Sequence, residues 1–255
     1  MISLVMGSYK RAKLLDACLD SILEYQYNFE LEVVVVNDGI PDDTEEVCKR
    51  HRGTVPVKYI FSGKRNLDGE CKPRMAGFSL NIGVQQCSGD YIVLSCAEIF
   101  HIGNCLTKIE SARTDAKKLL VPALMYFDDI GSVTGRITDI PRRHYGDLMR
   151  SLVRDKAAVR MPYLMGMWRN CYCAIGGYDE DFLGWAGEDN DLVCRLLETG
   201  CSYQQLDMPI IHLHHGKRCD SQAHPENPRW AYNWKLFQDR KTQLVRNQGR
   251  EWGTL

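Results

Sequence analysis

A glycine-rich segment that runs directly into acidic residues is the part of this sequence best suited to chemistry. Residues 176–182 read GGYDEDF, and residues 184–191 read GWAGEDND. Glycines around Trp185 allow close approach of the backbone and leave an aromatic face open, which suits stacking on a sugar ring. Glu188 and Asp189 begin a predicted helix, where free N–H groups and the helix dipole stabilise carboxylates. An acidic cluster can also be a plain helix cap, but the combined pattern favours a functional site.

The elements that position such residues alternate along the first half of the chain. Strands are predicted at 2–6, 31–36, 55–61 and 91–94, with helices near 14–23, 42–51 and 74–87. The run 31–36 is almost continuously β-branched, which is typical of a parallel strand covered on both faces. This order predicts an α/β fold with a mostly parallel central sheet flanked by helices. Ligands of such sheets bind beyond the carboxyl ends of the strands, here at 37–39 and 95–98.

The second half of the chain is less regular. A helix–strand unit near 105–126 leads into the stretch 136–160, where seven Lys or Arg against three Asp leave a local charge of +4. That stretch could grip an acidic acceptor, but a solvated face is the more common role. The helix that begins at 188 is predicted to end at Gly200. Residues 210–215 predict a last strand.

The quoted segments resemble GT-A glycosyltransferases. GGYDEDFLGWAGEDNDLVCRLLETG is similar to the acceptor-side motif of family 2, the polypeptide GalNAc-transferases and the β-1,4-galactosyltransferases. SLVMGSYKRAKLLDACLDSIL, LEVVVVNDG and SLNIGVQQCSGDYIVL resemble nucleotide-side segments of family 2. The resemblance implies a GT-A (Rossmann-like) fold, with one domain of two fused halves over 1–255. The expected divisions are a nucleotide-binding half at about 1–98, an acceptor half at about 99–215 and a helical tail at 216–255.

The resemblance also implies which residues bind the donor, a UDP-sugar. Asp38 matches the carboxylate that accepts a hydrogen bond from uracil, although an isolated Asp here would be typical of a turn. Ser8 lies where the family contacts the nucleotide. Asn81 matches a family Asn in the helix before the fourth strand, with Leu80 in place of the usual Arg. Trp185 would form the floor beneath the sugar.

Asp189 matches the catalytic base of the inverting members of the family. Sugar transfer passes through an oxocarbenium-like state, and the acceptor hydroxyl must lose its proton as it attacks. One carboxylate opposite the departing diphosphate achieves this in a single displacement. Glu188 is expected to hydrogen-bond the donor sugar or the acceptor hydroxyls.

The metal site is where the sequence departs from the family. Family members carry Asp-x-Asp where this chain has Cys96-Ala97-Glu98, and a thiol is a poor ligand for a hard cation. Glu98 retains a carboxylate, and His212 and His214 share one face of the predicted strand. We therefore predict that these three residues hold Mn²⁺ or Mg²⁺, with purely structural histidines as the alternative.

Two other outcomes are compatible with the lost Asp-x-Asp. Basic side chains could neutralise the diphosphate without a metal; the candidates are Lys64, Arg65, Lys217 and Arg218. Alternatively, the chain could be a non-catalytic nucleotide-sugar-binding module. A retaining transferase and a nucleotidyltransferase are further alternatives on the same type of sheet.

Composition narrows the class of protein and its setting. The chain has 255 residues, with 44% hydrophobic and 25% charged residues, as in an ordinary globular protein. No run approaches the roughly 18 apolar residues of a membrane span. A missing leader and eleven scattered cysteines without a CxxC pair favour reduced thiols in the cytoplasm.

The predicted activity is transfer of a hexosyl or N-acetylhexosaminyl group from a UDP-sugar to a hydroxyl, with inversion. The partners are thus a nucleotide sugar and an unknown acceptor: a glycan, a lipid-linked glycan, a protein or a modified base of phage DNA. A net charge of −1 disfavours the nucleic acid.

Overall fold

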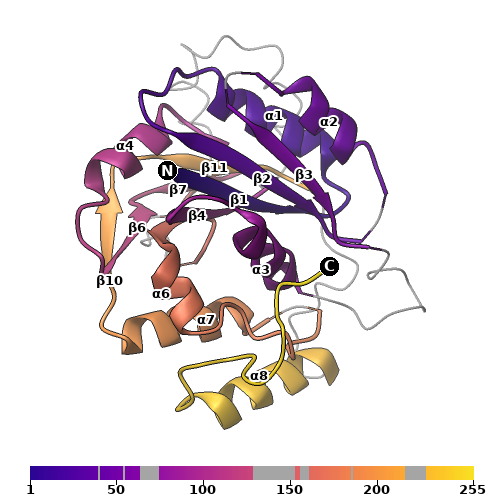
Figure 1. Cartoon of the computed structure of the whole chain (residues 1–255), viewed down its shortest axis with the longest axis vertical. Coiled ribbons are helices and arrows are strands. Elements are labelled where there is room, and N and C mark those ends of the chain that lie inside the picture. The colour runs from indigo at the N-terminus through magenta and orange to yellow at the C-terminus, as the bar shows by residue number, and fades with distance from the viewer. Residues whose placement is uncertain are drawn as a thin grey trace.

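A seven-stranded sheet with helices on both faces forms the centre of the structure (Figure 1). This computed structural model describes residues 1–39, 41–53, 55–63, 75–128, 153–155, 161–184, 186–215 and 228–255. The strands, in their order across the sheet, are β10 (Ser202–Leu206), β6 (Lys118–Pro122), β9 (Leu164–Trp168), β4 (Tyr91–Cys96), β1 (Ile2–Ser8), β2 (Leu31–Asn37) and β3 (Val57–Phe61). Neighbours are parallel, except that β9 is antiparallel to β4 and β6. The predicted mostly parallel α/β sheet is confirmed.

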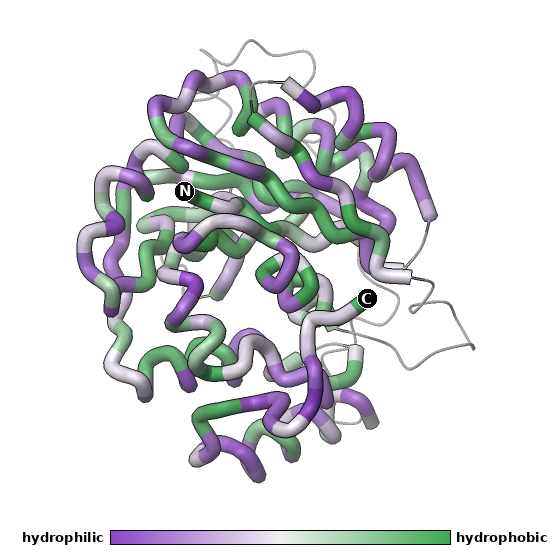
Figure 2. The backbone as a smooth tube through the Cα atoms, in the orientation of Figure 1, coloured by the Kyte–Doolittle hydropathy of each residue, from purple (hydrophilic) through white to green (hydrophobic). Residues whose placement is uncertain are grey.

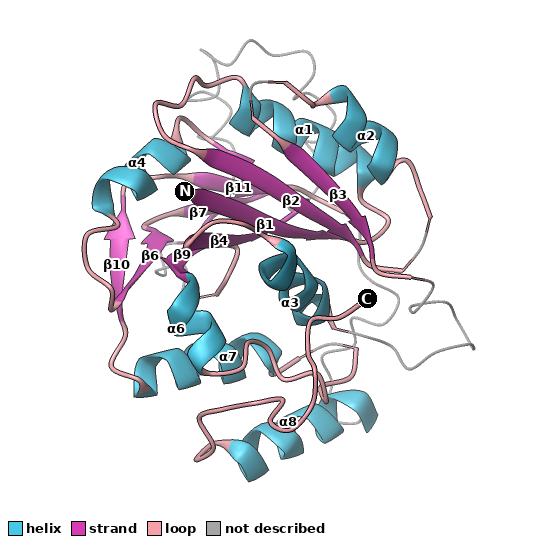
Figure 3. Ribbon diagram, viewed as in Figure 1, coloured by secondary structure: helices cyan, strands magenta, loops and turns pink. Residues whose placement is uncertain are grey.

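Helices cover both faces of this sheet (Figure 3). One face carries α1 (Ala12–Leu23), α2 (Thr44–Arg50) and α4 (Cys105–Ala112). The other carries α3 (Ala76–Gln86), α6 (Arg169–Ala174) and α7 (Glu188–Glu198), with α8 (Pro228–Arg240) against α7. The helices expected in the first half and from residue 188 are confirmed. No helix among the described residues is long and apolar enough to cross a membrane.

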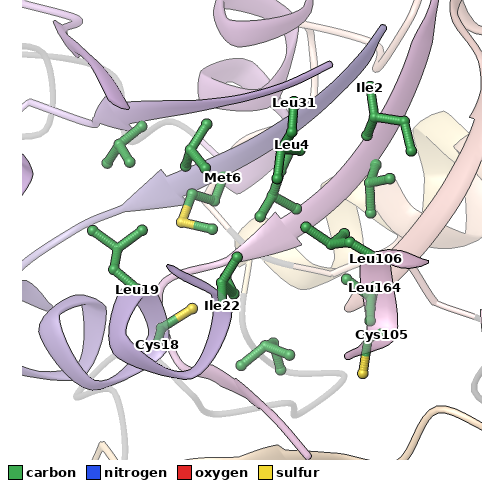
Figure 4. Packing of buried hydrophobic residues seen from close by; sticks show 14 of the residues in the cluster. Ile2, Leu4, Met6, Cys18, Leu19, Ile22, Leu31, Cys105, Leu106 and Leu164 are labelled. Carbon is green, nitrogen blue, oxygen red and sulfur yellow. The ribbon is translucent and has the colours of Figure 1, made fainter. Parts of the chain in front are cut away.

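Strand β2 shows why the sheet is covered twice. Val33 and Val35 belong to the cluster beneath α1 and α2, part of which is drawn in Figure 4, whereas Val34 and Val36 belong to the cluster beneath α3. All four side chains are fully buried, and each contributes on the order of 1.5–3 kcal/mol of hydrophobic stabilisation. In Figure 2 the central strands are mostly green (hydrophobic), whereas green and purple (hydrophilic) residues alternate along the helices around them. The β-branched run therefore fixes the orientation of the strand ends.

A second sheet of four strands lies beside the first. Its strands, in spatial order, are β5 (Ile99–His101), β11 (Ile210–His212), β7 (Met125–Phe127) and β8 (Val153–Asp155). Phe100 and Ile211 pack with Leu14 of α1. The predicted strand over 210–215 was too long, because β11 ends at His212. Within the tail that was expected to be helical over 216–255, α8 ends at Arg240, and the described residues after it are not helical.

Buried His101 makes the stability of this small sheet depend on pH. Burial lowers the pKa of His101 to about 3 from an ordinary 6.5, so the unfolded chain binds an extra proton between those values. The free energy of unfolding should fall as the pH drops from 6.5 to 3, by at most about 1.4 kcal/mol per unit. His101→Leu should remove this part of the pH dependence of the free energy of unfolding. Urea unfolding at several pH values measures it. Equal slopes for the variant and the wild type would contradict the prediction.

Candidate active site

The carboxyl ends of β1, β2 and β4 meet at one edge of the large sheet. The backbone N–H of Asp38 donates to the carbonyl of Ser8 at 2.9 Å. On the other side of β1, the N–H of Ala97 donates to the carbonyl of Gly7 at 3.2 Å. These bonds place Ser8 and Asp38, together with Glu98 just beyond Ala97, along a single rim.

Asp38 and Ser8 are both buried at this rim. The hydroxyl of Ser62 donates to Oδ1 of Asp38 at 3.1 Å, and the hydroxyls of Ser8 and Thr44 are hydrogen-bonded at 3.3 Å. The two predicted nucleotide-binding side chains thus have defined orientations beside each other. Their contacts with uridine stay a prediction.

Asn81 occupies a different place from the rim. Its Oδ1 accepts from the hydroxyl of Tyr172 at 2.6 Å and the N–H of Tyr178 at 2.9 Å. Its Nδ2 donates to the carbonyl of Tyr178 at 3.0 Å and to Glu180 Oε1 at 2.9 Å. A Cβ on Gly177, which has a φ of +64°, would lie 2.4 Å from Asn81 Oδ1, so this contact requires glycine. Asn81 therefore joins α3 to the 176–180 segment. Its contact with the nucleotide stays a prediction.

Asp189 lies in the first turn of α7 and is half-buried. Gly187, in the left-handed conformation at a φ of 88°, starts the helix, and Glu188 and Asp189 follow it. The hydroxyl of Tyr178 donates to Asp189 Oδ1 at 2.7 Å. Burial raises the pKa of Asp189 above its ordinary value, and the hydrogen bond from Tyr178 opposes that rise. A carboxylate with a raised pKa is well suited to accept a proton.

Tyr163 and Cys96 connect Asp189 electrostatically to Glu98. Burial raises the pKa of Tyr163 to about 12, and the negative charges of Asp189 and Glu98 add to the effect. Burial also raises the pKa of the Cys96 thiol far above its usual value, with Glu98 and Asp189 contributing in the same direction. Two side chains therefore lie in the fields of both carboxylates. The start of α7 and the end of β4 therefore lie close together.

The metal-type cluster contains His215 in place of the predicted His214. Ligand atoms of Glu98, His212 and His215 all lie within 4.8 Å of one another, a group that we call the Glu98 cluster. His214 is exposed and lies outside it. The prediction extended a two-residue alternation through residue 214, but β11 ends at His212 and the alternation ends with it. The N–H of Leu213 donates to the carbonyl of Glu98 at 2.9 Å, which keeps the two segments together.

The donor set of the Glu98 cluster fits a divalent transition metal. Two imidazoles and one carboxylate suit Mn²⁺ better than Mg²⁺, which prefers oxygen ligands. Burial lowers the pKa of His212, which favours the neutral form that binds metals. Arg11, which the sequence analysis did not single out, lies 3.1 Å from Nδ1 of His215 through its guanidinium. A guanidinium only donates, so Nδ1 is the acceptor in this arrangement.

Of the other residues in the sequence motifs, Asp191 has a structural role, and several others lie outside the described residues. Asp191, part of the acidic motif, is buried and pairs with Arg195 at 2.7 Å and with Arg246 at 2.5 Å. Arg246 also lies 3.0 Å from Asp179 and so joins the tail to the motif. Trp185 falls outside the described residues, as do the basic candidates Lys64, Arg65, Lys217 and Arg218.

Removal of Arg246 should destabilise the protein strongly. Arg246→Met leaves the buried carboxylates of Asp191 and Asp179 without that partner, which costs on the order of 3–5 kcal/mol. Lys235→Met is the matched control, since Lys235 and Asp239 form an exposed pair on α8 worth about 0–1 kcal/mol. Urea unfolding measures both. Similar losses of unfolding free energy in the two variants would show that the ion pairs of Arg246 do not stabilise the acidic segment.

Two family models match this chain. The one described as glycosyl transferase family 2 matches residues 3–172. The one described as the N-terminal domain of galactosyltransferase matches residues 163–217, which include α7 and β11. The two matches overlap over residues 163–172, which include β9.

The chain is also similar in sequence to individual curated proteins. Chondroitin synthase of Escherichia coli is 22% identical over 240 residues, covering 81% of this chain and 33% of that protein. Across the curated relatives, the chain spans between 24% and 52% of their length.

Solved structures show the shared fold. Residues 1–349 of S. aureus TarS, in complex with UDP-GlcNAc, superpose with a TM-score of 0.61 at 15% identity, covering 92% of this chain and 64% of that one. A mannosyltransferase from Pyrobaculum calidifontis, in complex with GDP-Man and Mn²⁺, gives a TM-score of 0.57 at 15% identity, covering 86% and 59%.

Proposed function

The chain belongs to glycosyl transferase family 2, and on that basis we propose that it transfers a sugar from a UDP-sugar to an acceptor hydroxyl with inversion. One observation carries the proposal: Asp189 and Glu98, from opposite halves of the chain, act on the same two side chains, Tyr163 and Cys96. A base and a diphosphate-side group must both lie near one anomeric carbon, and the two shared neighbours support that proximity.

The donor is proposed to lie along the rim formed by β1 and β2. Asp38 accepts the uracil N–H there, and Ser8 contacts the nucleotide. Support comes from the rim position of both residues and from the UDP-GlcNAc complex of the structurally similar S. aureus TarS.

Asp189 acts as the base in the proposed reaction. The acceptor oxygen attacks the anomeric carbon while the bond from that carbon to the diphosphate oxygen breaks, and UDP leaves with the bonding electrons. The proton of the acceptor hydroxyl passes to Asp189, whose raised pKa suits that role. Glu188, next to it in the same helical turn, binds sugar or acceptor hydroxyls.

The Glu98 cluster is proposed to hold Mn²⁺ through Glu98, His212 and His215. A bound cation supplies positive charge beside the diphosphate. Arg11, at His215, is a second source of positive charge in the same place. The acceptor stays general: a hydroxyl of a glycan, a lipid-linked glycan or a protein.

Asp189→Asn tests the proposed base. Turnover should fall by about 10²–10⁴, the usual contribution of general base catalysis, while the Kd for UDP stays unchanged. UDP release would be measured with UDP-glucose, UDP-galactose and their N-acetyl forms, over a panel of acceptors. Asp207→Asn, at a fully exposed side chain, is the control and should retain turnover. Full turnover in Asp189→Asn would rule out this base, and no transfer by the wild type with any donor would favour a binding module.

Metal removal and two histidine variants test the Glu98 cluster. Chelation should abolish turnover, and Mn²⁺ should restore it better than Mg²⁺, because two of the ligands are imidazoles. His215→Gln should weaken Mn²⁺ binding at least tenfold, whereas His214→Gln should not, as measured by electron paramagnetic resonance of free Mn²⁺. Unchanged turnover after chelation would instead indicate that Arg11, and not a metal ion, neutralises the negative charge of the diphosphate.

A further inference from the structure

Asp189 is held by a side chain that the acceptor motif contributes from outside its helix. The hydroxyl of Tyr178 donates to Asp189 Oδ1 at 2.7 Å, and the ring of Tyr178 is buried, with 1% exposure. Tyr178 lies eleven residues before Asp189, so the contact spans the entire glycine-rich segment. The orientation of the carboxylate therefore depends on where this tyrosine is fixed.

The position of Tyr178 is fixed from several directions. Its N–H donates to Asn81 Oδ1, and its carbonyl accepts from Asn81 Nδ2 at 3.0 Å and from Asn247 Nδ2 at 2.7 Å. Its ring packs against that of Tyr172, with centroids 6.3 Å apart. On the α3 side, a Cβ at Gly77 would lie 2.3 Å from the ring, so only glycine leaves room for it. The hydroxyl thus has little freedom to leave Asp189.

We propose that Tyr178 is a positioning residue for the base: its hydroxyl holds Oδ1 of Asp189 and leaves Oδ2 to receive the proton of the acceptor. The inference rests on the proposed role of Asp189. A fixed carboxylate loses no orientation entropy in the reaction, which is the advantage of a preorganised site.

The surroundings of Asp189 give the tyrosine a second effect. Tyr163, from the segment before β9, and Cys96, at the end of β4, lie in the field of the Asp189 carboxylate. Glu188 precedes Asp189 in α7, and its charge acts on Tyr163 and Tyr178 as well. Burial raises the pKa of Asp189, and among the described groups around it the Tyr178 hydroxyl is the one that opposes the rise. The hydrogen bond favours the ionised carboxylate, the form that can accept a proton.

Tyr178→Phe removes the hydroxyl and retains the ring. Carbon-13 NMR of protein labelled at the Asp carboxyl carbons would follow the titration of Asp189, assigned as the signal absent from Asp189→Asn. The pKa of Asp189 should rise in the variant. The acid limb of the pH–rate profile should move to higher pH, and kcat at neutral pH should fall roughly tenfold, as expected for one hydrogen bond to a charged group.

Tyr172→Phe is the matched control. Tyr172 is equally buried, packs on the same ring and donates its hydroxyl to Asn81 rather than to Asp189. It should leave the pKa of Asp189 and the acid limb where they are in the wild type. An unchanged Asp189 pKa in Tyr178→Phe, or an equal shift in both variants, would overturn the proposal, as would a shifted pKa with an unmoved acid limb.

A second variant works in the opposite direction and preserves the packing. Site-specific 3-fluorotyrosine at position 178 is a more acidic donor, so it should lower the pKa of Asp189 and move the acid limb to lower pH. If 3-fluorotyrosine leaves the pKa of Asp189 unchanged, the inference is contradicted, even if Tyr178→Phe folds poorly. The NMR titration does not depend on turnover, so a failure here is distinguishable from retained turnover in Asp189→Asn, which overturns the base itself.

Discussion

The hydrogen bonds between parallel β1, β2 and β4 are the constraint on which the rest of the site depends. They hold three strand ends at one rim, so residues from separate parts of the chain become neighbours through the backbone alone. The valines of β2 maintain this alignment, because a shift of one residue would exchange the faces beneath α1 and α3. Ser8 and Asp38 are thereby held side by side through main-chain bonds that do not involve their side chains.

The acceptor side is built on a different principle. The segment that leads to Asp189 has little regular structure, and buried charge and amide contacts hold it in place. Arg246 and Arg195 fix Asp191 behind α7, while Asn81 fixes the backbone around Tyr178. The sheet therefore supplies alignment, and the polar contacts supply the orientation of the Asp189 carboxylate.

Sequence patterns predicted the parts of the protein that depend on local periodicity. The central strands and their helices follow from runs such as 31–36, and the start of α7 follows from its acidic residues. Three-residue strands such as β5 and β11 are too short for a period, so His214 was chosen where His215 lies in the cluster. Arg246 and Arg11 could not be predicted, because their partners lie 55 and 204 residues away along the chain.

Asn81 lies in the helix of one half and hydrogen-bonds the backbone of the other, 97 residues further along. The effects of mutations at contacting residues on stability are not additive, so the two segments are energetically coupled. A side chain at position 177 would collide with Asn81 Oδ1, so a substitution there disturbs both segments at once. A chimera that joins the first half of this chain to the second half of a distant relative would lose the bonds between Asn81 and Tyr178, and with them the support of the tyrosine that holds Asp189.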